Sequence, residues 1–311
     1  MHREPRPRQE PMSRNILPLL NGLPGLAEPF TLDELAARHP LWAADVAALS
    51  PFAEAARLGL GEGDASTSCA PGKTDVVLCG ECGSTMDVAR HLVQQGALGP
   101  WGSVLAPVQA SGRGQLRREW LSRPGNLLAT VVCPPASGLW NDLRPLVLGY
   151  LFAEALSALG QAVQVKWPND LLSDGKKVAG ILVEERAACV LAGIGLNLAW
   201  APPPEALRDG HSVDACKFHT LNGALGPARL WHALVNHVET GYTTLLEAFS
   251  PHEFLMIFRT RMAWQGRRVC VQEGASVRYE ATVKGISGEG GLVLDRAGQE
   301  VVLLAGDVIP V

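Results

Sequence analysis

The residues best suited to chemistry in this sequence are cationic side chains set among glycines. In Ser111-Gly-Arg-Gly-Gln-Leu-Arg-Arg-Glu-Trp120, Arg113 stands between two glycines. Glycines let the backbone approach a ligand closely and leave its amides available to anionic groups. Arg113, Arg117 and Arg118 carry planar, forked donors that suit phosphate and carboxylate. The segment therefore predicts an anion-binding loop, although a mobile basic surface loop would have the same composition.

A second cationic motif is KWPND (166–170), followed closely by GKKVAG (175–180). Polar and apolar residues alternate over 161–166, which predicts a strand, and the proline of KWPND ends it because proline cannot donate to a ladder. The same alternation after the turn places Lys177 and Gly180 on opposite faces of a second strand. Taken alone, the motif is ordinary material for a hairpin with a solvated loop.

Two shorter motifs combine glycine with polar residues. Gly83-Ser-Thr-Met-Asp87 falls at a strand-to-helix junction, where Ser84 is a good N-cap and Asp87 occupies the capping-box position. A helix N-terminus also presents free N–H groups to polar ligand atoms. In Gly193-Ile-Gly-Leu-Asn197 the alternating glycines remove side chains from one face of a strand, as a ligand or a packed helix requires.

The composition indicates a globular protein with a substantial core. The chain has 311 residues, of which 47% are hydrophobic and 19% charged, and its formal net charge is −4. That charge gives no electrostatic reason to expect nucleic acid or an anionic membrane as partner, and no apolar run reaches the ~20 residues that span a bilayer. The N-terminus is basic and proline-rich without a signal-peptide pattern, which predicts a disordered tail on a cytoplasmic protein.

Seven scattered cysteines do not suggest a disulfide framework. Cys79-Gly-Glu-Cys82 has the spacing of a redox or zinc half-site, but a structural zinc needs four ligands and no second pair follows nearby. The preceding Val76-Val-Leu is typical of a buried strand, where cysteine packs as a small hydrophobe. The sequence therefore predicts no metal site.

The elements that would position these motifs change in texture along the chain. Residues 1–72 form an N-terminal extension with a short helical pair around 32–58 and a linker-like stretch at its end. Residues 73–262 alternate strands (76–79, 102–106, 127–133, 189–198) with helices (85–96, 142–159, 227–249). Residues 263–311 contain short strands between glycine turns, which predicts a small SH3-like barrel.

The order of the motifs resembles that of biotin protein ligases: Ser-Thr-Met, then Gln109 with GRG, KWPND, GKKVAG, GIGLN and a small barrel. The resemblance covers roughly residues 76–311. It implies an α+β fold, with a biotin/lipoate ligase-like (class II synthetase-like) catalytic domain built on a mixed sheet, followed by an SH3-like barrel. It also implies an activity: ATP activates biotin to biotinyl-5′-AMP, and biotin then passes to a lysine of a carrier domain, forming a C–N bond.

The resemblance implies roles for individual residues. Ser84, Thr85 and Gln109 would hydrogen-bond the ureido end of biotin, and Arg113 would close over the ligand. Lys177 would lie against the biotin carboxylate and the α-phosphate, where a cation offsets their repulsion. The implied biotin-binding set is Ser84, Thr85, Met86, Gln109, Gly112, Arg113, Gly114, Gln115, Lys177 and Gly180.

The nucleotide would be held by a second set: Arg117, Arg118, Trp120, Lys166, Asn169 and Asn197. Asp170 completes an implied catalytic group with Lys177 and Arg113. Magnesium would arrive on the ATP phosphates, so no all-protein metal cage is expected. The implied partner is the biotin carboxyl carrier domain of a biotin-dependent carboxylase.

Three positions depart from the family pattern. Gln115 stands where the family often has a basic residue, Arg117 stands where it often has glycine, and Met86 replaces a common asparagine. In the family, the first two positions help the loop fold over the adenylate. These departures therefore predict weaker retention of the adenylate, unless Arg117 and Arg118 compensate.

Several alternatives stay open beside this hypothesis. Some family members are also repressors with an N-terminal winged helix, but residues 14–72 carry three basic against seven acidic side chains, a net charge of −4. That is the wrong sign for a surface that contacts phosphates, and no strand pair for a wing follows the helical pair, so DNA binding is not expected. A lipoate or octanoate ligase has similar chemistry, and a non-catalytic scaffold would keep the fold without the lysines. The sequence leaves a homodimer open.

Overall fold

The computed structural model describes residues 14–49, 75–115, 118–186, 189–207, 213–221, 223, 225–274 and 277–311. Its largest element is a mixed eight-stranded sheet with strand order β1-β2-β3-β4-β8-β7-β6-β5. The strands are β1 (Ile16–Pro18), β2 (Val76–Leu78), β3 (Ser103–Ala106), β4 (Leu127–Cys133), β5 (Gln164–Lys166), β6 (Asp170–Ser173), β7 (Lys176–Arg186) and β8 (Cys189–Leu196). Only β1-β2 and β2-β3 pair in parallel among these strands.

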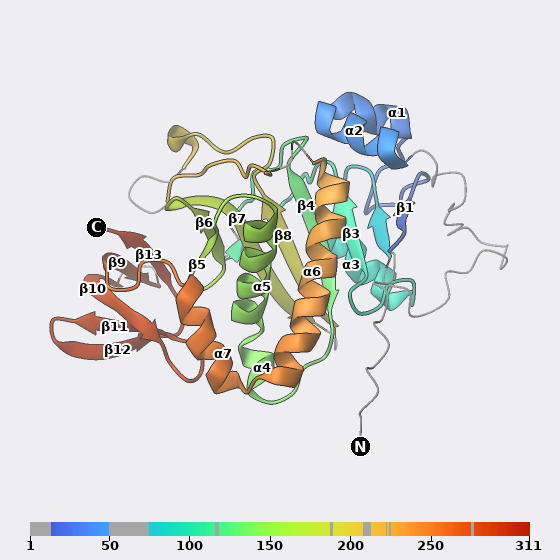
Figure 1. The fold of residues 1–311 in the computed structure, drawn as a ribbon. Helices are drawn as coiled ribbons and strands as arrows, with labels where there is room; N and C mark the ends of the chain where they lie inside the picture. The colour runs from blue at the N-terminus through green and yellow to red at the C-terminus, as the bar shows by residue number, and fades with distance from the viewer. Residues whose placement is uncertain are drawn as a thin grey trace, which may run out of the picture.

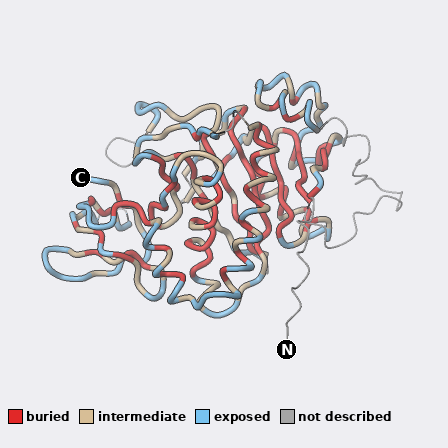
Figure 2. The backbone as a smooth tube through the Cα atoms, in the orientation of Figure 1, coloured by how far each residue is buried: buried red, intermediate tan, exposed pale blue. Residues whose placement is uncertain are grey.

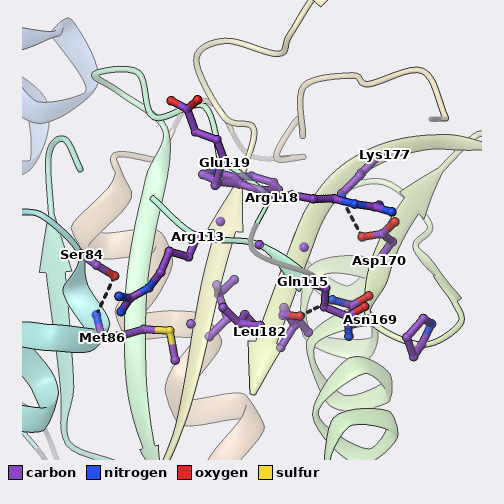
Figure 3. A pocket seen from close by; sticks show the side chains of 18 of the residues that line it. Ser84, Met86, Arg113, Gln115, Arg118, Glu119, Asn169, Asp170, Lys177 and Leu182 are labelled. Atoms are coloured by element: carbon purple, nitrogen blue, oxygen red, sulfur yellow. Dashed lines mark hydrogen bonds and ion pairs between the residues drawn. The ribbon is translucent and has the colours of Figure 1, made fainter. Parts of the chain in front are cut away.

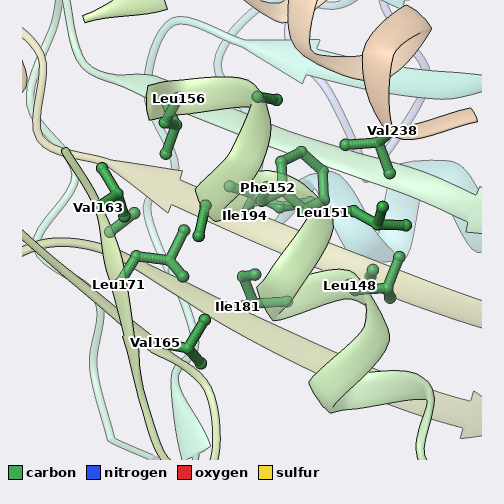
Figure 4. Close-up of a cluster of buried hydrophobic side chains, with 14 of the residues drawn as sticks. Leu148, Leu151, Phe152, Leu156, Val163, Val165, Leu171, Ile181, Ile194 and Val238 are labelled. Atoms are coloured by element: carbon green, nitrogen blue, oxygen red, sulfur yellow. The ribbon is translucent and has the colours of Figure 1, made fainter. Parts of the chain in front are cut away.

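Helices lie on both faces of this sheet, and its strands β2, β3 and β4 consist of buried residues throughout (Figures 1 and 2). On one face α5 (Arg144–Leu159) and α6 (Pro227–Ala248) lie side by side, with α4 (Leu139–Asp142) before them and α7 (Pro251–Phe258) after them. Their apolar side chains meet Ile181 and Ile194 of the sheet (Figure 4). On the other face α3 (Thr85–Gln94) packs on β3, β4 and β8 through a smaller cluster that includes Val88, Leu92 and Val132.

The N-terminal segment is built into this architecture. Its β1 extends the sheet beyond β2, and Leu19 and Leu23 join the core beneath α3. Its two helices, α1 (Leu32–Arg38) and α2 (Pro40–Leu49), lie at the top of the sheet in Figure 1, and α2 contacts α6. The side chains of Leu35 and Trp42 are fully buried in the main core. Residues 1–13 of the expected tail lie outside the described residues. So do residues 50–74, which hold the end of the helical pair and the linker-like stretch where the sequence predicts no wing.

The C-terminal residues form a separate antiparallel sheet, in the order β12-β11-β10-β9-β13. Its strands are β9 (Arg268–Glu273), β10 (Val277–Ile286), β11 (Leu292–Arg296), β12 (Gln299–Leu303) and β13 (Asp307–Pro310). The short turn η3 (Arg259–Arg261) leads from α7 to this sheet, whereas η2 (Pro204–Ala206) lies between β8 and α6. This small domain is joined to the main sheet by Trp167, whose Nε1 donates to the Gly290 carbonyl at 3.0 Å. The KWPND motif therefore sits where the two sheets meet.

The predicted elements agree with these bounds to within a few residues, with one difference at the hairpin. The structure has a three-stranded meander there, because β6 forms between β5 and β7. The tight turn lies at Asp174 and Gly175, whose φ values of 49° and 76° are both left-handed, rather than across the whole stretch from Trp167 to Lys176. Left-handed φ at both central residues is the geometry of a two-residue hairpin turn. Because the turn is this short, residues 170–173 form the strand β6.

Candidate active site

One cavity of about 150 Å³ lies on the α3 face of the sheet, between β7, β8, the GRG loop and the start of β13. Figure 3 shows Ser84, Met86 and Arg113 toward one end, and Asp170, Lys177 and Arg118 toward the other. The structure brings together most of the residues predicted for the site: Ser84, Thr85, Met86, Gln109, Arg113, Gly114, Gln115, Arg118, Trp120, Lys166, Asn169, Asp170, Lys177 and Gly180.

At the Ser84 end of the cavity the groups at the start of α3 are polar and uncharged, and the charge of Arg113 is paired with Asp87. Ser84 is the N-cap of α3, and its hydroxyl accepts from the Met86 amide at 3.3 Å. The first residue of the helix, Thr85, donates from both N and Oγ1 to Gln109 Oε1, at 2.8 and 3.0 Å. The N-cap geometry predicted from sequence is therefore present, and it sets two hydroxyls and one amide at a helix N-terminus, suited to a neutral polar group.

The opposite end holds a network of charges drawn from three separate parts of the chain. Asp170 lies between two lysines, with Oδ2 3.0 Å from Lys166 Nζ and Oδ1 2.5 Å from Lys177 Nζ. Asp307 of β13 lies 2.7 Å from Lys166 Nζ and 2.9 Å from Arg118 Nη1. Three cations face two carboxylates, so the network keeps one net positive charge, as a site for phosphate or carboxylate needs.

Burial and pairing together set the protonation of this network. Burial would raise the pKa of Asp170, but the charges of Lys177 and Lys166 outweigh it and hold the pKa well below its ordinary value. Burial would also raise the pKa of Asp307, and Lys166 in turn lowers it. For Lys166, whose side chain is only 5% exposed, burial would lower the pKa, but Asp170 and Asp307 raise it above its usual value. All three groups are therefore charged at neutral pH.

Glycines leave a flat shelf along the middle of the cavity. Gly180 of β7 and Gly195 of β8 are paired in register, and the Trp120 indole lies across them. A side chain at Gly195 would collide with that indole, and one at Gly180 would meet it at 3.1 Å. Trp120 Nε1 is buried and has no hydrogen-bond partner among the described residues, while Lys177 Nζ lies 5.4 Å from the ring centroid. The alternating glycines thus serve close approach, as their spacing predicted.

The predicted placement of Lys177 and Gly180 on opposite faces of β7 was wrong, because the strand contains a β-bulge. Leu171 pairs with Ala179 and Leu172 pairs with Lys177, so Val178 is an extra residue without a partner. A bulge of this kind reverses the alternation of side chains beyond it. Lys177 therefore shares the face of Gly180, where a side chain would lie 3.5 Å from Lys177 Nζ, and Val178 turns into the core. This bulge brings the lysine into the cavity.

The GRG loop is folded as a small hairpin over the cavity. Gly114 N donates to the Arg118 carbonyl at 2.7 Å, and Trp120 N donates to the Gly112 carbonyl at 2.9 Å. Arg113 reaches the first turn of α3, where its Nη2 lies 2.8 Å from Asp87 Oδ1. The Asp87 hydrogen bond and charge raise the pKa of Arg113. Of the arginines predicted to bind anions, Arg113 and Arg118 lie in this hairpin and line the cavity.

Two predicted residues lie elsewhere, and a third is not described. Gly112 stands at the base of the hairpin, against the Trp120 carbonyl, and is not among the cavity-lining residues. Asn197 is buried behind β7 and donates from Nδ2 to the Lys177 carbonyl at 3.3 Å. Arg117 lies outside the described residues.

Sequence reasoning missed several lining residues, of which Asp307 matters most. The others are Glu119, Ala129, Pro168, Ile181, Leu182, Gly193, Ile194, Gly195 and Gly306. The sequence indicated that Gly193 and Gly195 lie on one strand face but did not place them in the site. Asp307 gave no signal, because an acidic residue among short barrel strands looks like ordinary surface. Cys79 and Cys82 are buried in the core beneath α3, and the described residues contain no group of three or more potential metal-ligating side chains.

Chemically, the cavity can hold an elongated ligand with a neutral polar head and an anionic tail. The head would meet Ser84, Thr85 and Gln109, and the tail would meet Lys177 and its neighbours. Both groups of residues line the same cavity.

Comparisons with known proteins point the same way. The sequence model of the biotin/lipoate A/B protein ligase family matches residues 82–198. A biotin–[acetyl-CoA-carboxylase] ligase of Paracoccus denitrificans is 33% identical over 225 residues, which cover 64% of this chain and 86% of that protein. The bifunctional ligase/repressor BirA of Bacillus subtilis is 28% identical over 239 residues, covering 68% and 66% respectively. The structure of a biotin protein ligase from Aquifex aeolicus in complex with biotin and ATP superimposes with a TM-score of 0.62 at 25% identity, covering 75% of this chain and 97% of that one.

Proposed function

This chain belongs to the biotin protein ligase family, and we propose that it activates biotin with ATP to biotinyl-5′-AMP and then transfers the biotinyl group to a lysine of a carrier domain. One observation carries the proposal. A neutral hydrogen-bonding end and a net-positive end share one cavity. Biotin combines a neutral ureido head with a carboxylate at the end of an apolar chain, and the two ends of the cavity match these two groups.

In the first step a biotin carboxylate oxygen forms a bond to the α-phosphorus of ATP, and the bond to the pyrophosphate oxygen breaks. Both reacting groups are anionic, so a cation between them lowers the barrier. Lys177 suits this position, since its side chain is 29% exposed and lies on the glycine face of β7. Lys166 and Arg118 supply further positive charge toward the phosphates.

In the second step the carrier lysine attacks the acyl carbon, AMP leaves, and the amine loses a proton. Asp170 is poorly suited to accept that proton, because its pKa is held well below neutral and each of its oxygens contacts a lysine. An effective general base has a pKa near the working pH. We assign Asp170 to positioning Lys166 and Lys177 instead.

Magnesium would enter with the ATP phosphates and neutralise part of their charge. Three carboxylates line the cavity, Glu119, Asp170 and Asp307, and the last two are already paired with cations. Magnesium commonly binds through one or two carboxylates together with substrate phosphates and water. The donor set fits a metal held mainly by the nucleotide.

The proposed acceptor is the biotin carboxyl carrier domain of a biotin-dependent carboxylase, encountered in the cytoplasm. No helix in the described part of the chain is long and apolar enough to span a membrane.

The test is transfer of biotin by purified protein supplied with ATP, magnesium and a carrier domain, followed by mass spectrometry of the carrier. We expect a single lysine to gain one biotinyl group, with pyrophosphate released in equal amount. Lipoate and octanoate are offered in parallel reactions. Transfer of either of these without transfer of biotin would assign the protein to the lipoate branch of the family.

A further inference from the structure

Behind the polar end of the cavity, three side chains form a continuous chain of hydrogen bonds. Thr85 Oγ1 lies 3.0 Å from Gln109 Oε1 and 2.8 Å from Thr130 Oγ1. Thr130 is fully buried on β4, where it pairs directly with Gly193. Directly opposed residues of neighbouring strands point to the same face of a sheet, so Thr130 stands on the cavity face beneath Thr85.

The chemistry of these groups fixes the direction of each bond. The Thr85 backbone N–H can only donate, and it points at Gln109 at 2.8 Å, so the oxygen of that amide faces it. Because this same oxygen cannot donate, the Thr85 hydroxyl must donate its single proton to it. With that proton in use, the Thr85 oxygen can only accept from Thr130. The chain therefore runs one way, from Thr130 through Thr85 to Gln109.

This direction decides what the site presents to a ligand. The amide nitrogen of Gln109 is turned away from Thr85 and offers two N–H donors. Thr85 Oγ1, which has one lone pair occupied by Thr130, keeps its second lone pair as an acceptor. A cyclic urea carries one carbonyl acceptor and two N–H donors, so it complements a fixed donor beside a fixed acceptor.

We propose that Thr130 is a positioning residue that sets the donor and acceptor pattern for the ureido head, an inference that rests on the proposed function. Thr130 lines no part of the cavity itself and acts through Thr85. Hydrogen bonds in a buried chain polarise one another, and a buried acceptor deprived of its donor is costly. Loss of the Thr130 hydroxyl should therefore weaken recognition of the ureido group and leave the phosphate end unchanged.

The test begins with calorimetric binding of biotin to the full-length wild type and to Thr130→Val, which removes the hydroxyl at nearly constant volume. We expect the biotin Kd to rise about tenfold, as for one lost hydrogen bond. The KM for ATP, measured at saturating biotin, should change less than twofold. Thr130→Ser keeps the hydroxyl and should bind within about twofold of wild type. Equal Kd values for wild type and Thr130→Val would overturn the inference alone, whereas a wild type that does not bind biotin would overturn the proposed function with it.

Two controls separate positioning from general packing. Ser103 is an equally buried hydroxyl of the same sheet, and it accepts from Trp231 Nε1 at 2.9 Å, remote from the cavity. Ser103→Ala should lower thermal stability without changing the biotin Kd, and an equal rise in Kd would show that destabilisation alone explains the effect.

The second control is a double-mutant cycle. In a Thr85→Val background the proposed route through Thr85 is gone, so adding Thr130→Val should change the biotin Kd less than twofold. A full tenfold effect in that background would show that Thr130 acts by another route and would overturn the inference.

Discussion

Lys177 lies beside Asp170 and above the glycine shelf, where we propose that its charge offsets that of the reacting groups. We predict that Lys177→Ala slows adenylate formation by about 10²–10³, because one charge-stabilising donor is lost from the transition state. Pyrophosphate release measures this rate, and the melting temperature should change little, since the side chain is not part of the core.

The neighbouring lysine provides a matched control. Lys176 is exposed and does not line the cavity, so Lys176→Ala should leave pyrophosphate release within about twofold of wild type. Near-normal activity of Lys177→Ala would show that another cation, such as Lys166, performs this role.

Gln115 lines the cavity from the GRG hairpin and is labelled in Figure 3. Arg118, the candidate to replace a missing cation here, is already paired with Asp307. A charge-assisted bond to phosphate is about twice as strong as a neutral one, so we predict that Gln115→Arg lengthens the residence of biotinyl-5′-AMP about tenfold. Chasing labelled adenylate with excess unlabelled ligand measures this residence time. Equal release rates would indicate that the downstream arginines already close the loop.

At the scale of elements, α2 secures the beginning of α6. The N-cap of α6 is Gly226, which has no side chain to cap with, and the buried carboxylate of Asp45 accepts from the Ala228 amide at 2.7 Å and from Arg229 Nε at 2.9 Å. We predict that Asp45→Ala lowers the free energy of unfolding by about 1–2 kcal/mol, as other lost helix caps do. Asp33→Ala, at an exposed position of α1, should change it by less than about 0.5 kcal/mol. Equal effects in chemical denaturation would show that α2 does not stabilise α6 through this carboxylate.

The same N-terminal segment is poorly suited to bind DNA. Arg14 is buried and pairs with Glu239, while Arg38 lies 3.1 Å from Glu81, so these two arginines are engaged within the protein. With a net charge of −4 over residues 14–72, we predict no sequence-selective retention of an operator fragment by the full-length protein. A mobility-shift titration at low and moderate salt tests this. Salt-sensitive binding of one sequence over a scrambled one would contradict it.

At the scale of the whole molecule, the small C-terminal domain contributes to the catalytic cavity through Asp307. We predict that Asp307→Asn raises the KM for ATP about tenfold and leaves the biotin Kd unchanged, because Lys166 and Arg118 lose the carboxylate that orients them. Asp295→Asn is the matched control, since Asp295 pairs with Lys284 within the small domain at 3.6 Å. A rise in the biotin Kd as large as that in the ATP KM would point to a general loss of structure instead.

The stability difference between wild type and Asp307→Asn should also depend on pH. Folding lowers the pKa of Asp307, so its contribution to stability is fully present above the unfolded value of about 3.9 and is lost as pH falls through the folded value. The stability difference between wild type and Asp307→Asn should therefore stay constant at pH 5–8 and shrink as the pH is lowered below about 4. Urea unfolding at each pH measures it. A difference that grows on acidification would mean that the carboxylate is not stabilised by its cations.

Much of the site could be predicted from local pattern. The N-cap at Ser84, the end of β5 before Pro168 and the glycine face of β8 each follow from the preference of one residue type for one backbone setting. The order of the motifs then indicated the family, and the cavity does gather Ser84, Gln109 and Lys177. These features depend on residues near one another in sequence, and a single chain displays them directly.

Other features depend on contacts between distant segments, and only the tertiary structure decided them. The bulge at Val178 places Lys177 on the same face of β7 as Gly180, whereas the sequence predicted opposite faces. The reason is that strand register is set by the partner strand and not by the alternation of the strand itself. Asp307 enters the cavity from another sheet, and Thr130 acquires its role only by lying under Thr85. The sequence by itself determined which side chains were available for chemistry. Long-range pairing decided which of them face one another, because that pairing joins segments whose separation in sequence carries no local signal.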